Sequence, residues 1–209
     1  MDISVIIPAY NEKRYIEKTL QALHDVEIIV VCNACTDTTK DIAEKYATKL
    51  LVLQEKGVSR ARNAGAKIAS HSRLVFLDAD ILVENDLFQK IAHSPYTIGT
   101  SLVKADSSSL LDQYMMTLKS QLHRFGYCTG LIFCDKDLFE RAGQFEEELS
   151  KKEDGRFLRR AKKIGKYGVV DGYVYNNLRR FRAKGYLSEI WYWIREYLFP
   201  SEEEYESVR

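Results

Sequence analysis

The chain is poor in the residues that mark several protein classes. Its 209 residues include only 3 prolines, 11 glycines and 4 cysteines, which excludes a collagen-like chain and a disulfide-dense scaffold. No apolar run reaches the roughly 20 residues of a transmembrane helix, and no secretory signal sequence stands before the first strand. We therefore expect a cytoplasmic protein whose cysteines are reduced.

An excess of charge of one sign is also missing. The 31 Lys and Arg residues nearly balance the 30 Asp and Glu residues, so the net charge is +1. This balance gives no argument for binding nucleic acid or an anionic membrane. The hydrophobic share of 45% and the charged share of 29% are ordinary for a globular protein. The length favours a single domain over residues 1–209.

Short apolar runs alternate with helical patterns in the first part of the chain. The runs at 3–7, 27–31, 50–53 and 74–77 predict strands, and the patterns at 13–23, 36–46 and 59–69 predict helices. We expect Pro8 to end the first strand. Strands that alternate with helices predict an α/β fold with a mostly parallel sheet covered on both faces. Ligands bind such sheets at the carboxyl ends of the strands.

After Val103 the alternation weakens. Residues 105–110 favour a loop, residues 127–134 a strand, and Leu138, Phe139 and Ala142 a helix. The helix after Glu153 and Asp154 is expected to bury Phe157, Leu158, Ala161 and Ile164. Residues 187–198 predict an amphipathic C-terminal helix, and 202–206 an acidic tail.

The strongest local signal is Asp78-Ala79-Asp80, which follows an apolar run directly. Two carboxylates two positions apart on an extended backbone point to the same side. Their repulsion is relieved by a divalent cation with oxygen ligands that also bridges to phosphates. The sequence therefore predicts a metal site at Asp78 and Asp80, in preference to two solvated loop carboxylates.

The other strand ends are less specific. Residues 8–12 lack the glycines of a dinucleotide turn or a phosphate-binding loop, but Tyr10 can flank a planar base. Asp37 can accept hydrogen bonds from a nucleoside or can start a helix. Arg62 suits a diphosphate or a base edge, or a surface helix. Glu153 and Asp154 fit either a catalytic role or a helix start that favours acidic residues.

Taken together, these segments resemble the family 2 inverting glycosyltransferases of the GT-A fold. The matching segments are 4–12, Thr36-Asp37, 61–65, 78–80 and Glu153-Asp154, in the family's order across residues 3–165. The resemblance implies a GT-A-like single domain. Its parts would be a nucleotide-sugar-binding half (1–103), an acceptor-side half (104–180), and a C-terminal helix with its tail (181–209).

The resemblance also implies roles for individual residues. The donor would be a nucleotide-diphospho-sugar and the cofactor Mn²⁺ or Mg²⁺. Asp80 would ligate the metal, Asp78 would lie near the metal and the ribose, and Asp154 would be the general base beside Glu153. Arg179 or Arg180 would add positive charge at the diphosphate. The residues expected at the nucleoside end are Pro8, Tyr10, Glu12, Asn33, Asp37 and Arg62.

One segment departs from the family pattern. Where the family commonly has acidic residues and Gly-Ser after the second strand, this chain has Cys32-Asn33-Ala34-Cys35. Asn33 keeps the capacity to hydrogen-bond but loses the charge. We expect the two cysteines to be reduced packing residues rather than a redox switch.

Two other functions would also fit parts of this pattern. A phosphatase of the haloacid-dehalogenase type would use Asp78 as a nucleophile, but it carries its motif on the first strand. A degenerate sugar-nucleotide-binding or partner-binding module would have lost catalysis, whereas this chain keeps all the carboxylates. The aromatic residues of 191–199 fit packing on the domain itself or on a second subunit, or else a peripheral contact with the inner face of a membrane and a lipid-linked acceptor.

Overall fold

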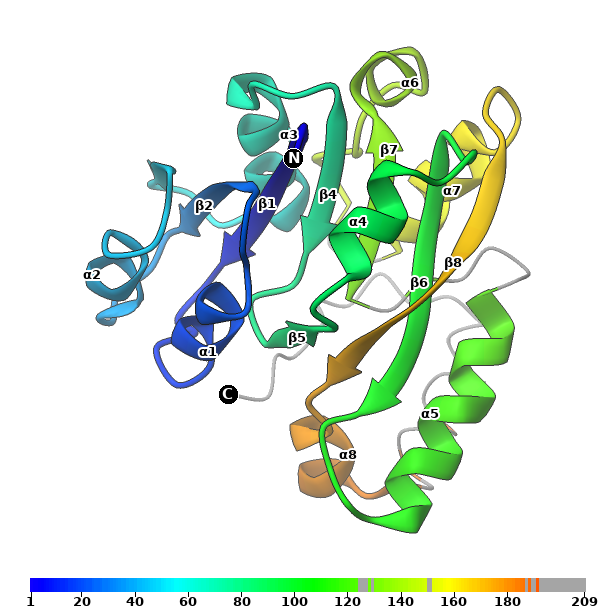
Figure 1. Cartoon of the computed structure of the whole chain (residues 1–209). Coiled ribbons are helices and arrows are strands. Elements are labelled where there is room, and N and C mark those ends of the chain that lie inside the picture. The colour runs from blue at the N-terminus through cyan, green and yellow to red at the C-terminus, as the bar shows by residue number, and fades with distance from the viewer. Residues whose placement is uncertain (124–127, 129, 150–151, 187, 189–190, 192–209) are drawn as a thin grey trace.

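The structure is a computed structural model that describes residues 1–123, 128, 130–149, 152–186, 188 and 191, with the side chain of Arg180 not described (Figure 1). Most of the predicted C-terminal helix and its tail lie outside these residues. Within them, helices cover both faces of one sheet, as the sequence predicts, and the sheet contains antiparallel as well as parallel pairs of strands.

The sheet has the strand order β3-β2-β1-β4-β7-β6-β8-β5 in the described part of the chain. The neighbours β3, β2, β1 and β4 are all parallel, whereas β7 is antiparallel to both β4 and β6. β8 is parallel to β6 and antiparallel to β5. The bounds are β1 Ile3–Ala9, β2 Glu27–Asn33, β3 Lys49–Leu53, β4 Arg73–Leu77, β5 Ile81–Val83, β6 Ile98–Ala105, β7 Leu131–Asp135 and β8 Tyr167–Asn176.

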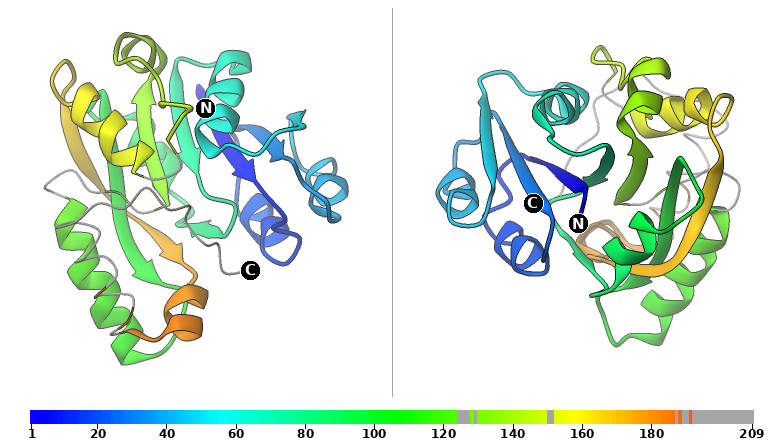
Figure 2. Two further views of the ribbon diagram at one scale, coloured as in Figure 1. Left: turned by 180° about the vertical axis from the view of Figure 1, so that it is seen from behind. Right: turned by 45° about the horizontal axis from the view of Figure 1, so that its top comes forward.

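The strands alternate their side chains between two hydrophobic clusters, one on each face of the sheet. In β1, Val5 and Ile7 join the cluster with α1, α2, α4 and α5, whereas Ile6 joins the one with α3, α6 and α7. Figure 1 and the left view of Figure 2 show these layers from opposite sides. The helix bounds are α1 Ile16–Gln21, α2 Thr39–Ala43, α3 Val58–Ile68, α4 Leu87–Ala92, α5 Leu110–Leu122, α6 Lys136–Arg141, α7 Glu153–Ala161 and α8 Arg179–Lys184.

Three expectations from the sequence are wrong in detail. β1 continues through Pro8 to Ala9. The missing N–H is tolerated there because β1 pairs with β4 only as far as Ile6, so Pro8 has a partner strand on one side alone. Ile164 is 46% exposed, because α7 ends at Ala161 before reaching it. Asp78 and Asp80 lie in a turn, in which the Ile81 N–H donates to the Asp78 carbonyl, and not on extended backbone.

Two glycines allow the close approaches that shape one end of the sheet. A Cβ at Gly65 would lie 2.4 Å from Ile6, so only glycine lets α3 pack this closely on β1. Gly130 has φ +71°, and its carbonyl accepts the Asp78 N–H at 2.9 Å. The first contact seats α3 on β1, and the second joins the residue before β7 to the residue after β4.

Helix α5 carries an apolar outer face that the sequence analysis did not identify. The helix buries Met116 and Ser120 but exposes five large side chains, which are Leu110, Leu111, Tyr114, Leu118 and Leu122. In the described part of the protein, no helix combines the length and the apolar character needed to cross a membrane.

Candidate active site

The polar residues predicted from the strand ends gather at the carboxyl edge of β1, β2 and β4. Asp78 follows β4, Arg62 lies on α3, and Glu153 and Asp154 open α7. These three segments are distant in the sequence, and hydrogen bonds between their side chains join them.

Arg62 stands at the centre of three carboxylates. Its Nη1 donates to Asp154 Oδ1 at 2.6 Å and to Glu153 Oε1 at 3.0 Å, and its Nη2 donates to Asp78 Oδ1 at 3.1 Å. The Arg62 side chain is 7% exposed, whereas those of Asp78 and Asp154 are 44% and 34% exposed. The arginine is thus a buried anchor, and two of its partners face the solvent.

An aromatic cluster and an asparagine hold this arrangement in place. The rings of Phe76, Phe139, Phe145 and Phe157 pack together, with centroids 4.7–5.6 Å apart. The Arg62 guanidinium lies 5.2 Å from the Phe145 ring. The Asn63 amide exchanges two hydrogen bonds with the Phe145 backbone, at 2.9 and 3.1 Å. Asn63 therefore fixes α3 to the segment that leads to α7.

Asp154 has the properties of a base near neutral pH. Burial raises its pKa, and the charges of Glu153 and Asp78 raise it further, while Arg62 works in the opposite direction. The net result is a pKa of about 7. A carboxylate with this pKa is ionised in about half of the molecules at pH 7 and is a stronger proton acceptor than an ordinary one.

A second arginine stands on the other side of the Asp78–Asp80 turn. Arg179, at the start of α8, donates through both guanidinium nitrogens to the two Glu12 oxygens at 2.8 and 2.9 Å. Its Nη2 also lies 3.2 Å from Asp80 Oδ2. The guanidinium stacks 4.6 Å from the ring of Tyr15. Glu12 and Arg179 were expected at the site from the sequence, but Tyr15 was not, because no local pattern distinguishes it.

Asp80 is a carboxylate whose surroundings favour a nearby cation. Burial and the charges of Asp78 and Glu12 raise its pKa to about 6, although Arg179 lowers it. In the described residues, no group of three or more His, Cys, Asp or Glu side chains has the spacing of a metal site. The protein therefore offers two carboxylates with hard oxygen atoms, which fit Mn²⁺ or Mg²⁺ if a ligand's phosphates and water supply the rest.

Of the residues expected at the nucleoside end, Arg62 and Glu12 belong to the two clusters above, and Asn33 and Asp37 have partners in the neighbouring loops. Asn33 is buried, and its Oδ1 accepts the Gly57 N–H at 2.8 Å, which fixes the loop before α3. Asp37 Oδ1 accepts the Thr39 N–H at 2.9 Å at the start of α2. The Lys56 ammonium lies 5.0 Å from the Tyr10 ring. Asn33 and Asp37 thus shape the loops around the site.

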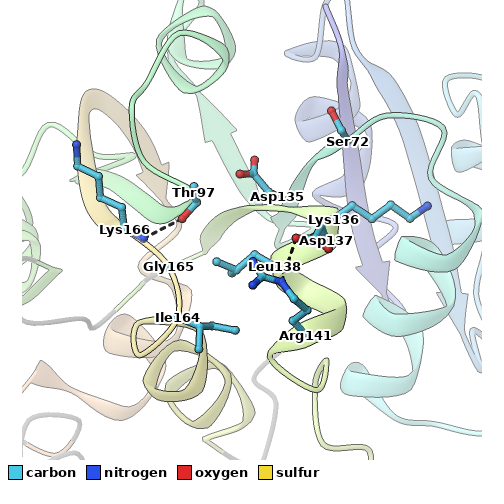
Figure 3. Close-up of a pocket in the computed structure, with 10 residues that line it drawn as sticks. All are labelled: Ser72, Thr97, Asp135, Lys136, Asp137, Leu138, Arg141, Ile164, Gly165 and Lys166. Atoms are coloured by element: carbon cyan, nitrogen blue, oxygen red, sulfur yellow. Dashed lines mark hydrogen bonds and ion pairs between the residues drawn. The ribbon is translucent and has the colours of Figure 1, made fainter.

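Two cavities lie at different ends of the sheet. One of about 250 Å³ is lined by Asn11, Lys13, Arg14, Tyr15, Asp37 and Arg179, so it joins the loop after β1 to the Arg179 cluster. The other, of about 510 Å³, lies around the end of β7, between Thr97, Asp135 and Lys166 (Figure 3). This larger cavity is remote from the carboxylates, so the smaller one is the better candidate for a ligand of that site.

Arg179→Met is expected to lower the free energy of unfolding by about 1–2 kcal/mol, because it leaves the carboxylates of Glu12 and Asp80 without their partly buried partner. Arg141→Met is the matched control. Its ion pair with Asp137 is exposed, with side chains 57% and 80% accessible, so we expect a loss below about 0.5 kcal/mol. Urea unfolding measures both. Equal losses would show that the Arg179 cluster adds no stability beyond a surface pair.

The comparisons with known proteins agree with this arrangement. Residues 4–105 match the model of Glycosyl transferase family 2. The uncharacterized glycosyltransferase EpsJ of Bacillus subtilis is 29% identical over 186 residues, which cover 74% of this chain and 54% of that protein. The chain thus spans about half the length of this curated relative.

Two solved structures share the fold. S. aureus TarS 1-349 in complex with UDP-GlcNAc has a TM-score of 0.68 at 23% identity, over 85% of this chain and 58% of that one. The mannosyltransferase PcManGT from Pyrobaculum calidifontis, in complex with GDP-Man and Mn²⁺, has a TM-score of 0.68 at 22% identity, over 93% and 64%. Sheet, motif order and family match all agree: residues 4–105, about half of the chain, match glycosyl transferase family 2, and the chain has a GT-A-like fold.

Proposed function

We propose that this protein transfers a sugar from a nucleotide-diphospho-sugar to an acceptor hydroxyl, with inversion at the anomeric carbon and with the help of a divalent cation. The observation that carries the proposal is the convergence of Asp78, Glu153 and Asp154 on the buried Arg62, with Asp80 near enough for the charge of Asp78 to raise its pKa. Structural neighbours are described in complex with UDP-GlcNAc and with GDP-Man and Mn²⁺. Those names support a nucleotide-sugar donor for this chain.

Asp154 is the proposed general base. With a pKa of about 7, its carboxylate can take the proton of the acceptor hydroxyl as that oxygen attacks the anomeric carbon. Attack from the face opposite the leaving nucleoside diphosphate inverts the configuration. Arg62 holds Asp154 at 2.6 Å, so the base is oriented before the acceptor arrives. Glu153, which is 12% exposed, is less accessible to an acceptor.

Asp78 and Asp80 would hold the cation, which supplies positive charge to stabilise the diphosphate leaving group. Arg179 lies within reach of Asp80 and can contribute positive charge at the same place. Tyr10, Asn11 and Asp37 would face the nucleoside beside the cavity of about 250 Å³. We further propose, from the sequence alone, that the protein acts in the cytoplasm.

The function is tested by a screen of UDP- and GDP-sugars by thermal shift, with and without Mn²⁺, followed by an assay of metal-dependent release of nucleoside diphosphate. Stabilisation by one class of nucleotide-sugar together with release supports the transferase. Binding of a nucleotide-sugar without release of nucleoside diphosphate, with every acceptor tried, supports the degenerate binding module. Release of phosphate from phosphomonoesters without nucleotide binding supports the phosphatase.

Asp80→Ala is expected to abolish Mn²⁺-dependent nucleotide binding while the fold stays intact. Removing a carboxylate whose burial and like-charged neighbours disfavour its ionisation does not destabilise the free protein. Asp137→Ala is the control, since Asp137 lines the remote cavity. Calorimetry of Mn²⁺ with UDP or GDP checks the prediction. Unchanged metal-dependent binding in Asp80→Ala would remove Asp80 from the metal site.

A further inference from the structure

Cys32 and Cys35 form a pair of thiols that the proposed chemistry does not use. Cys32 lies in β2 and is fully buried, and Cys35 is partly buried and packs against the same hydrophobic cluster. Cys32 is the register partner of Ala9 on the neighbouring strand β1. The Cys35 Sγ donates to the carbonyl of the same Ala9 at 3.2 Å. The pair therefore lies at the carboxyl ends of β1 and β2, behind the loops of the candidate site.

The backbone between the two cysteines is already sharply turned. β2 ends at Asn33, and Ala34 has φ +58°, in the left-handed region. The Ala34 N–H donates to the Leu53 carbonyl at 2.9 Å, which holds this conformation. A disulfide needs two sulfurs at about 2.05 Å with their Cα atoms within roughly 7 Å. Both cysteines adjoin Ala9 and only two residues separate them, so a local movement of Cys35 brings the two sulfurs to that geometry.

The two sulfurs differ in reactivity. The neighbouring Cys32 thiol lowers the pKa of Cys35, burial raises it, and the backbone of Asn11 and Asn33 lowers it further. The neighbouring Cys35 thiol and burial together raise the pKa of Cys32. Thiolates are the nucleophiles in sulfur oxidation, so Cys35 attacks first and Cys32 is the resolving thiol.

We propose that Cys32 and Cys35 form a reversible disulfide on reaction with a hydroperoxide, and that the oxidised protein binds its nucleotide donor more weakly. The Cys35 thiolate attacks an oxygen of hydrogen peroxide, the O–O bond breaks, and a sulfenic acid and one water form. The Cys32 sulfur then attacks the sulfenic sulfur, the S–O bond breaks, and a second water leaves. Two thiols are oxidised to one disulfide while one peroxide is reduced to two waters.

The effect on the donor follows from the residues attached to Cys35. The Thr36 N–H donates to Asn11 Oδ1 at 2.8 Å, and the Asn11 amide donates back to Thr36 Oγ1 at 3.0 Å. Drawing Cys35 toward Cys32 shifts Thr36 and Asp37, which follow it in the chain. This step rests on the proposed function, which places Asn11 and Asp37 at the nucleoside end of the donor.

The test uses the full chain, reduced with dithiothreitol and then treated with equimolar hydrogen peroxide. Intact mass is expected to fall by two hydrogen atoms and to recover on reduction, and peptide mapping is expected to link Cys32 with Cys35. Cys134→Ala, which alters a buried thiol in β7, should behave as wild type. Cys35→Ser should not lose hydrogen, and Cys32→Ser should stop at a sulfenic acid that dimedone traps.

Affinity for UDP and GDP, measured by calorimetry with Mn²⁺, is expected to fall at least about fivefold on oxidation, the lower end of usual couplings between sites. No loss of mass, or a disulfide that uses Cys128 or Cys134, would overturn the oxidation site. A Cys32–Cys35 disulfide with unchanged affinity would overturn the coupling. If the reduced protein binds no nucleotide, both the proposed function and the coupling are overturned. The intact mass would still show whether the Cys32–Cys35 disulfide forms.

Discussion

Asp154→Asn is expected to bind the donor normally and to transfer sugar at least about a hundredfold more slowly, the usual scale for loss of a general base. The amide keeps the shape of the side chain and still hydrogen-bonds with an acceptor, but it cannot take the proton. In the wild type, turnover should rise with pH to half its maximum near pH 7, because the ionised form of Asp154 is the active one and its pKa is about 7. The variant should lose this dependence.

Stability gives a second readout of the same carboxylate. Because folding raises the pKa of Asp154 from 3.8 to about 7, its contribution to stability is fully present below pH 3.8 and is lost as pH rises through 7. Asp154→Asn should therefore gain stability relative to the wild type between pH 5 and pH 8, measured by urea unfolding. A constant difference across this range would mean that Asp154 is ionised at both ends of it.

Glu153→Gln is the matched control, because adjacent helical side chains diverge by about 100° and Glu153 is less exposed than Asp154. It should retain most of the turnover. Near-wild-type turnover in Asp154→Asn with a dead Glu153→Gln would reassign the base to Glu153. Near-wild-type turnover in both variants would remove this pair from the mechanism.

Arg62→Met is expected to have the second large effect, on both stability and pH dependence. Loss of one partner of a buried ionic network costs about 3–5 kcal/mol. We expect about 2–3 kcal/mol here, since Asp78 and Asp154 are partly solvated. Without the guanidinium, the pKa of Asp154 rises further. The pH profile of turnover should therefore move to higher pH, and turnover at pH 7 should fall.

The measurements are urea unfolding and the pH dependence of kcat and KM. Arg62→Lys keeps the charge but loses the planar fork that reaches three carboxylates, so it should restore the pH profile more than the stability. A variant with an unshifted profile but a much weaker donor affinity would place Arg62 at the nucleotide, which is the role that the family resemblance implies. A stability loss alone would make Arg62 a structural residue.

Much of the parallel half of the sheet could be predicted from the sequence. The strands β1, β2, β3 and β4 are continuous apolar runs that end at polar residues, and a buried parallel strand requires both of those features. The same reasoning pointed to Asp78 and Asp80, because polar side chains at strand ends face the solvent-filled edge of the sheet. The other segments of the candidate site were proposed only through the order of motifs that resembles the family.

The antiparallel half of the sheet was harder to predict from the sequence, and β8 illustrates the reason. Its buried face consists of Gly168, Val170, Gly172 and Val174, so glycine stands at half of the positions where an apolar side chain would reveal the alternation. Those glycines are needed because Tyr96 packs against Gly168 and Leu87 against Gly172. The strand is therefore determined by its pairing with β6 and β5 and not by its own residues.

The partners within the site were decided by tertiary structure alone. Arg62 and Asp154 are 92 positions apart, and Arg179 and Glu12 are 167 apart. The sequence could name these residues as polar groups near strand ends, but their pairing depends on how α3, α7 and α8 pack on the sheet. The sequence determined which side chains reach the carboxyl edge. The fold decided that one arginine is buried among the carboxylates beside Asp154, because only packing can remove a charge from water and surround it with its counterions.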